Sequence, residues 1–143
     1  MKLAVPALLL VALSTITTGR AQTPALLLYG GSDHETFLGC VNCSQFEADS
    51  ICNQFGRFGS EFQSDGIWNM FGTYGSKFNT SSPWNQFSQG SVVIVDRNGG
   101  FYGFLTANKF ANKRTTIAAL NQLADGAAES SQLTTVRNLF CGL

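Results

Sequence analysis

The residues of this sequence that are best suited to chemistry are one histidine, His34, and four cysteines, Cys40, Cys43, Cys52 and Cys141. In an oxidising compartment an even number of cysteines predicts two disulfides. Four cysteines allow three ways of pairing, and their spacing does not select one. A bond from the 40–52 cluster to Cys141 would tie the end of the chain to its centre and add roughly 3–5 kcal/mol of stability.

The C-x-x-C spacing of Cys40 and Cys43 also suggests thiol redox chemistry. A reactive first cysteine usually follows a strand and begins a helix, and residues 30–39 do not read as such a strand. Zinc binding by the cysteine cluster with Cys141 or His34 fits no common zinc module. An exported thiol-redox or metal-binding protein is therefore the alternative function, and we expect no cofactor and no metal.

No other set of residues predicts catalysis. His34 is a lone histidine between Asp33 and Glu35, and the sequence has no G-x-S-x-G motif around a nucleophilic serine. We therefore assign no catalytic residue and expect a protein that is not an enzyme.

Residues 1–21 have the layout of a secretory signal peptide. Lys2 precedes an apolar run from Leu3 to Leu13, and Gly19-Arg20-Ala21 places small residues where a signal peptidase reads them. A membrane-spanning helix needs about 20 apolar residues, so the run is too short for a permanent anchor. We expect cleavage after Ala21, with Ser14 as the alternative, and a secreted or periplasmic chain without a transmembrane segment.

Composition limits the remaining chain, residues 22–143, to one small domain. The formal net charge of the whole sequence is zero, and only 13% of its residues are charged. Proteins that bind nucleic acids normally carry a basic stripe, so we expect no nucleic-acid partner. The basic residues at 109–114 are either a solvated face or a mild patch for an anionic wall polymer.

The centre of the sequence repeats with a period of 16 residues. Residues 49–64 read DSICNQFGRFGSEFQS, residues 65–80 read DGIWNMFGTYGSKFNT, and residues 81–87 begin again as SSPWNQF. One such unit cannot bury its apolar side chains alone, so neighbouring units must stack.

Each unit is expected to contain a single helical turn. Ser82-Pro83 combines a favoured helix cap with the favoured first helical residue, and Gly56 and Gly72 stand where a helix would end. A solenoid with one strand per unit is the alternative, although Pro83 would interrupt its hydrogen-bond ladder.

The repeated aromatic residues divide into core and surface candidates. We expect most of them to form the core, as listed here: Phe55, Phe58, Phe62, Phe71 and Phe78. Trp68, Trp84 and Tyr74 are the candidate ligand contacts, because tryptophan is often partly exposed and aromatic rings stack on sugar rings.

The C-terminal third predicts α+β structure. Residues 91–95 and 101–107 flank a turn at Asp96–Gly100 and predict a β-hairpin. Thr116 begins a predicted helix that ends at Gly126, and Ser130 or Ser131 begins another that ends before Gly142. These helices should cover one side of the hairpin. Residues 25–29 are a candidate edge strand.

The motifs resemble those of small exported bacterial proteins of unknown function. The matching segments are Leu38–Cys43 (LGCxNC), the N-x-[FY]-G-x-[FY]-G-S units, SPWN at 82–85 and the hairpin at 93–103. The resemblance implies export from a bacterium and supplies no catalytic residue. We therefore predict a non-enzymatic binding or structural module of the cell envelope, with an envelope polymer or a protein as partner.

Overall fold

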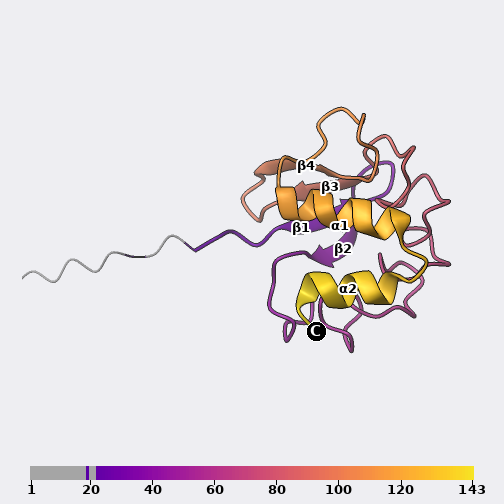
Figure 1. Cartoon of the computed structure of the whole chain (residues 1–143). Helices are drawn as coiled ribbons and strands as arrows, with labels where there is room; N and C mark the ends of the chain where they lie inside the picture. The colour runs from indigo at the N-terminus through magenta and orange to yellow at the C-terminus, as the bar shows by residue number, and fades with distance from the viewer. Residues whose placement is uncertain (1–18, 20–21) are drawn as a thin grey trace, which may run out of the picture.

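The computed structural model describes Gly19 and residues 22–143, so the predicted signal peptide at 1–21 lies outside the described residues apart from Gly19. The order of elements is β1 (Leu27–Gly30), β2 (Thr36–Cys40), β3 (Val92–Val95), β4 (Phe101–Leu105), α1 (Ala118–Glu129) and α2 (Leu133–Cys141). A long segment without helix or strand, residues 41–91, connects β2 to β3. We call it the turn segment (Figure 1).

The four strands form one antiparallel sheet in the order β2-β1-β3-β4. The predicted hairpin is confirmed, because Val92 pairs with Leu105 and Val95 with Phe101. The predicted edge strand is wrong in position: β1 lies between β2 and β3. Sequence reasoning missed β2, which is short and contains Gly39 at a φ of 111°.

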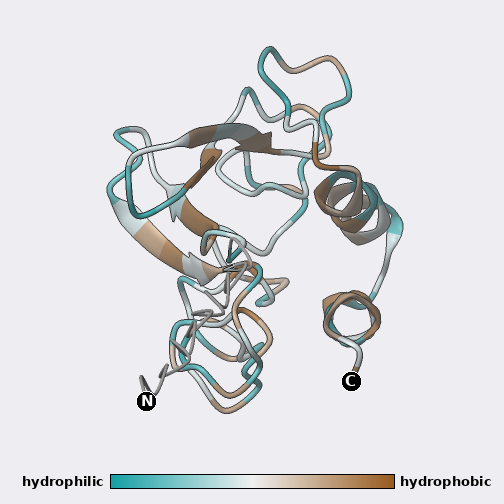
Figure 2. Ribbon diagram, turned by 90° about the vertical axis from the view of Figure 1, so that its left-hand side faces the viewer, coloured by the Kyte–Doolittle hydropathy of each residue, from teal (hydrophilic) through white to brown (hydrophobic). Residues whose placement is uncertain are grey.

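Both C-terminal helices lie on the same side of the sheet, which Figure 2 shows with the helices viewed nearly end-on. The predicted stop at Gly126 is wrong, since α1 continues to Glu129. The expected caps are also wrong: Ile117 and Gln132 precede the helices, and neither makes a side-chain capping bond. Gly142 ends α2 in the left-handed conformation, as expected.

The core lies between the sheet, the helices and the inner side of the turn segment. Leu28, Val92, Ile94 and Leu105 are almost completely buried on the sheet, and Leu120, Leu123 and Ala124 on α1 belong to the same hydrophobic cluster. The turn segment contributes its own buried residues, listed here: Ile51, Phe58, Ile67, Trp68, Tyr74 and Trp84.

The turn segment is a series of tight turns rather than helices or strands. The N–H of Asn53 donates to Ser50 O, that of Gly56 to Asn53 O, and that of Ser60 to Gly56 O. Between residues 41 and 91, the one strand-like contact is a bridge from Ser50 to Cys40. The expected one-turn helices are therefore not present in this segment, which contains tight turns instead. The strand solenoid is also not what the structure shows, and the expectation of short turns is the closer of the two.

Neighbouring stretches of the turn segment are joined through tryptophan. Trp68 Nε1 donates to Ile51 O and Trp84 Nε1 donates to Ile67 O, both at 2.7 Å. The two indole rings stack with centroids 5.8 Å apart. A buried indole usually needs a hydrogen-bond acceptor, and here the backbone of the preceding stretch supplies it.

Both ends of the turn segment are covered by other parts of the chain. At its start, Cys40 N donates to Asp49 O and Ile51 N donates to Cys40 O. At its end, Ala107 N donates to Pro83 O at 2.7 Å. The segment is therefore enclosed between β2 and the residues that follow β4.

Candidate functional site

The structure places the three predicted ligand contacts inside the core. Trp68 and Trp84 are 1% and 0% exposed, and Tyr74 is 8% exposed. The expectation of partly exposed indole rings is therefore wrong. These rings are buried on the inner side of the turn segment, where they fill the space between its neighbouring stretches. The indole N–H groups also donate hydrogen bonds to backbone carbonyls there.

The exposed aromatic residues are phenylalanines, and seven of them are 81–100% exposed. We call this set the phenylalanine array, and its members are Phe46, Phe55, Phe62, Phe71, Phe78, Phe87 and Phe110. Four residues expected in the core, Phe55, Phe62, Phe71 and Phe78, belong to it, so that expectation is wrong. Phe58 is 9% exposed and lies in the core as expected.

A common local structure holds every member of the array. The residue two positions before each phenylalanine is Ser or Asn, and its side-chain oxygen accepts the phenylalanine N–H. For Phe71 the acceptor is Asn69 Oδ1 at 3.1 Å, and for Phe87 it is Asn85 Oδ1 at 2.7 Å. These Asx and Ser turns fix the backbone so that the ring points away from the core.

Phe110 shows what sequence reasoning missed. It lies outside the repeated segment, after β4, yet Asn108 Oδ1 accepts its N–H at 3.0 Å and Asn108 Nδ2 donates to Ser88 O at 2.9 Å. The usable signal is the triplet itself, because Asn108-Lys109-Phe110 repeats the [Ser/Asn]-x-Phe pattern.

The array encloses three open clefts. The first has a volume of about 390 Å³ and lies between Phe62 and Phe71, with Trp68 and Asn69 in its lining. The second, about 380 Å³, lies between Phe78 and Phe87, with Trp84 and Asn85. The third, about 330 Å³, lies between Phe87 and Phe110. Ligand pockets in proteins have volumes of about 300–1,000 Å³.

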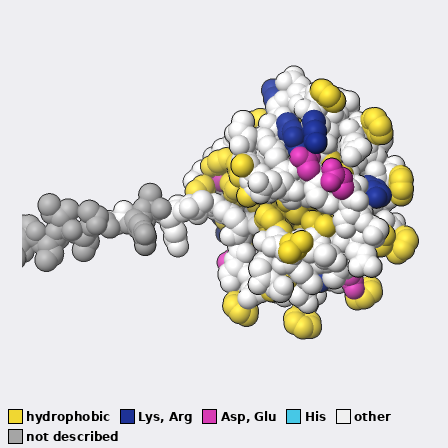
Figure 3. All heavy atoms as spheres, in the orientation of Figure 1, with side chains coloured by type: hydrophobic (Ala, Val, Ile, Leu, Met, Phe, Trp, Pro, Cys, Tyr) yellow, Lys and Arg dark blue, Asp and Glu magenta, His cyan; other side chains and the backbone are white. Residues whose placement is uncertain are grey.

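The rings of the array stand apart from one another on the surface. Figure 3 shows hydrophobic side chains that project separately around the edge of the molecule, with other surface and some charged side chains between them. The residues before the phenylalanines are mostly polar, as listed here: Gln45, Gln54, Glu61, Met70, Lys77, Gln86 and Lys109. The surface thus alternates aromatic faces with polar groups.

Two of the three charged residues that line the clefts, Glu61 and Lys77, are held by internal contacts. Thr134 Oγ1 donates to a carboxylate oxygen of Glu61, and Lys77 Nζ donates to Ser130 O at 3.2 Å. Arg137 is buried, donates to Gly59 O at 2.8 Å, and has its pKa lowered by that burial. These contacts attach the helices to the turn segment.

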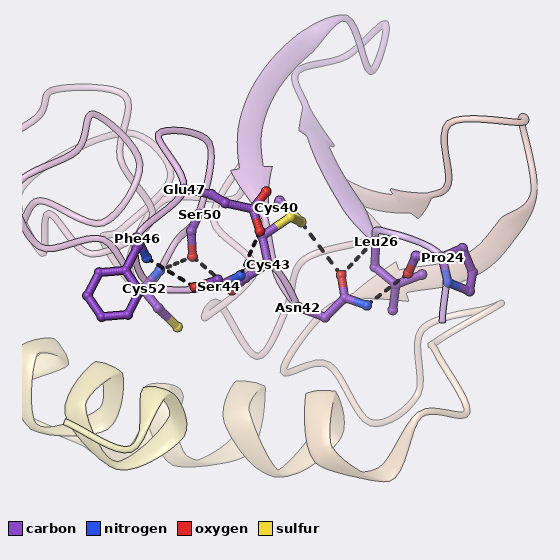
Figure 4. The surroundings of a disulfide bond; sticks show 10 residues. All are labelled: Pro24, Leu26, Cys40, Asn42, Cys43, Ser44, Phe46, Glu47, Ser50 and Cys52. Atoms are coloured by element: carbon purple, nitrogen blue, oxygen red, sulfur yellow. Dashed lines mark hydrogen bonds between the residues drawn. A yellow bond between two sulfur atoms is a disulfide. The ribbon is translucent and has the colours of Figure 1, made fainter. Parts of the chain in front are cut away.

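The four cysteines form the two expected disulfides. Cys40 pairs with Cys43, and Cys52 pairs with Cys141, so the end of α2 is tied to the turn segment. Figure 4 shows Asn42 beside the first bond, where its Oδ1 accepts from Leu26 N at 2.7 Å and its Nδ2 donates to Pro24 O at 2.9 Å.

The remaining candidates for chemistry lie apart. His34 is partly buried, and its Nε2 is 3.2 Å from Gly90 O. Within residues 22–143, no group of three or more His, Cys, Asp or Glu side chains is placed to hold a metal ion. In the part of the chain that the structure describes, no helix is both long and apolar enough to cross a membrane.

Comparison of the chain with family models, with curated proteins and with solved structures finds no match.

Proposed function

We propose that this protein is an exported, non-enzymatic binding module of the bacterial cell envelope, and that the phenylalanine array is its contact surface. The observation that carries the proposal is the exposure of seven phenylalanines, each 81–100%, in one recurring turn. Isolated apolar side chains on a surface are ordinary. Seven exposed phenylalanines held by the same type of hydrogen bond indicate a binding role.

The turn segment supports this role as a display scaffold. We interpret it as the 16-residue repeat of the sequence, in which two aromatic positions of a unit are buried and two are exposed. Buried Trp68 and Trp84 hold the units together, while Phe71 and Phe87, three residues further on, face solvent. Each unit therefore keeps its shape without using the exposed rings.

The proposal is tested by retention on a purified, insoluble cell-envelope fraction. We expect the exported chain to sediment with this fraction, and a variant with Phe62, Phe71, Phe78 and Phe87 changed to Ser to stay in the supernatant. The matched control is Leu139→Ser, which removes an equally exposed apolar side chain, 80% exposed, from α2. Retention of the quadruple variant at the level of the unmodified chain would overturn the proposal.

A second candidate is thiol redox activity at Cys40–Cys43, favoured by the disulfide across a C-x-x-C spacing. Cys40 ends β2 and no helix begins beside it, so the helix dipole that lowers a reactive thiol's pKa has no counterpart there. Alkylation and intact mass after mild reduction separate the two candidates. The redox candidate would be favoured if mild reductant opens the Cys40–Cys43 bond in the folded protein, and the two thiols then reduce a disulfide substrate while the Cys40–Cys43 bond forms again.

A further inference from the structure

The first two clefts of the array are equivalent to each other. Phe62 and Phe71 flank the first, and residues 16 positions later, Phe78 and Phe87, flank the second. Trp68 and Trp84 lie in the corresponding linings, and their stacked rings are 5.8 Å apart. The two clefts therefore follow one another in the same orientation on neighbouring stretches of the turn segment.

The third cleft continues this row. It shares Phe87 and Gln86 with the second cleft, and Phe110 forms its other wall. Among the described residues, Gln86 and Gln89 make no side-chain hydrogen bond, so their amides are free to bind a ligand. A molecule that fills all three clefts must be elongated, and the two equivalent clefts favour a chain with repeating units.

The charges beside the clefts favour an uncharged ligand. Glu61 stands at the first cleft, Lys77 at the second and Lys109 at the third. A polymer of one charge sign would meet an unfavourable charge in at least one cleft. Glu61 and Lys77 are moreover occupied by Thr134 and by Ser130 O.

The combination of aromatic walls with amide groups points to a saccharide. The C–H face of a pyranose ring packs on an aromatic ring, and amides exchange hydrogen bonds with its hydroxyl groups. A lipid surface would instead require a continuous apolar patch, whereas hydrophobic side chains project separately on the face that Figure 3 shows, and mostly polar residues precede the phenylalanines in the sequence. We infer that the three clefts form one row of subsites for an uncharged glycan chain, an inference that rests on the proposed binding function.

The test is titration of the exported chain with a neutral glucan hexasaccharide and with an N-acetylglucosamine hexasaccharide. Isothermal calorimetry measures the affinity. Tryptophan fluorescence reports on the clefts directly, because the chain has only two tryptophans and both line clefts. We expect at least one of these saccharides to bind and to change the fluorescence, and its monosaccharide to bind far more weakly.

Phe87→Ser should weaken binding of the hexasaccharide about tenfold, because Phe87 borders two clefts and its ring is lost from both. Gln86→Ala should weaken it less. The matched control is Leu139→Ser, which removes an apolar side chain that is 80% exposed and lies neither in the array nor in any of the three clefts. This control should bind as the unmodified chain does.

The inference is overturned if neither hexasaccharide binds, if Leu139→Ser weakens binding as much as Phe87→Ser, or if an anionic polysaccharide binds more tightly at physiological salt. Envelope retention that still depends on the array would then leave the proposed function standing, with a protein partner or a second copy of the chain as the ligand. Retention that is independent of the array would overturn both proposals.

Discussion

At the scale of single residues, short polar side chains decide the structure of this protein. An Asn or Ser that accepts the N–H two residues later sets each turn, and the same device recurs outside the turn segment at Thr106 and Thr115. Asp96 uses it in the hairpin, where its Oδ1 accepts from Asn98 N at 2.8 Å and from Gly100 N at 2.9 Å.

Asp96 should make stability dependent on pH at the acid end. The N–H of Gly100, the Tyr102 hydroxyl and the N–H of Asn98 lower the pKa of Asp96 below its ordinary 3.8. A group whose pKa is lowered by folding stabilises the folded state above its unfolded pKa and loses that contribution as pH falls through the folded pKa.

We therefore expect Asp96→Asn to lower the free energy of unfolding most above pH 3.8, with the difference from the unmodified chain shrinking as pH falls below that value. Urea unfolding at a series of pH values measures this difference. A difference that stays constant between neutral pH and pH 2 would contradict the account.

The hydrophobicity of the phenylalanines does not distinguish the exposed ones from the buried ones. Phe55 and Phe58 are three residues apart and chemically identical, yet one faces solvent and the other packs on Phe37 with ring centroids 4.9 Å apart. Hydrophobicity alone places both in the core. The triplet pattern separates them, because Phe55 follows Asn53 by two residues whereas Arg57 and Gly56 precede Phe58.

At the scale of elements, the strongly periodic parts were predictable. The β-branched residues of β3 and the apolar faces of α1 and α2 indicate their structure without tertiary information. The short strand β2 and the first residues of the helices depend on contacts with distant parts of the chain, such as the pairing of β2 with β1. Local sequence patterns carry no information about these contacts.

Two glycines should respond oppositely to alanine. A Cβ on Gly75 would lie 2.0 Å from Asn69 O, which is a backbone atom that cannot move aside, whereas a Cβ on Gly126 in α1 meets nothing within 4 Å. Gly126→Ala should stabilise the protein by about 0.5–1 kcal/mol, because alanine favours the helix.

Gly75→Ala should unfold the protein or lower its stability by several kcal/mol, on the order of the most severe single substitutions. Thermal unfolding of the two variants side by side makes the comparison. Equal melting temperatures would show that the close approach at Gly75 is not part of the folded structure.

At the scale of the whole molecule, the two disulfides make unequal contributions. Cys52–Cys141 closes a separation of 89 residues and Cys40–Cys43 one of 3. In the chain-entropy model, the long loop contributes about 4–5 kcal/mol and the short one about 1–2 kcal/mol.

Changing Cys52 and Cys141 to Ala should therefore lower the free energy of unfolding by the larger amount and loosen α2 from the turn segment. Changing Cys40 and Cys43 to Ala is the matched comparison. Hydrogen exchange on α2 distinguishes the two, and greater loss of protection in the Cys40/Cys43 variant would contradict this assignment.

The most direct test of the account is the free energy of unfolding of a variant with Phe55, Phe71 and Phe87 changed to Ser, measured by urea denaturation. Since these rings are 81–100% exposed, the account predicts a loss of no more than about 1–1.5 kcal/mol in total, the range of ordinary surface substitutions. A loss of about 3–5 kcal/mol for each ring would place the rings in the core and remove the contact surface.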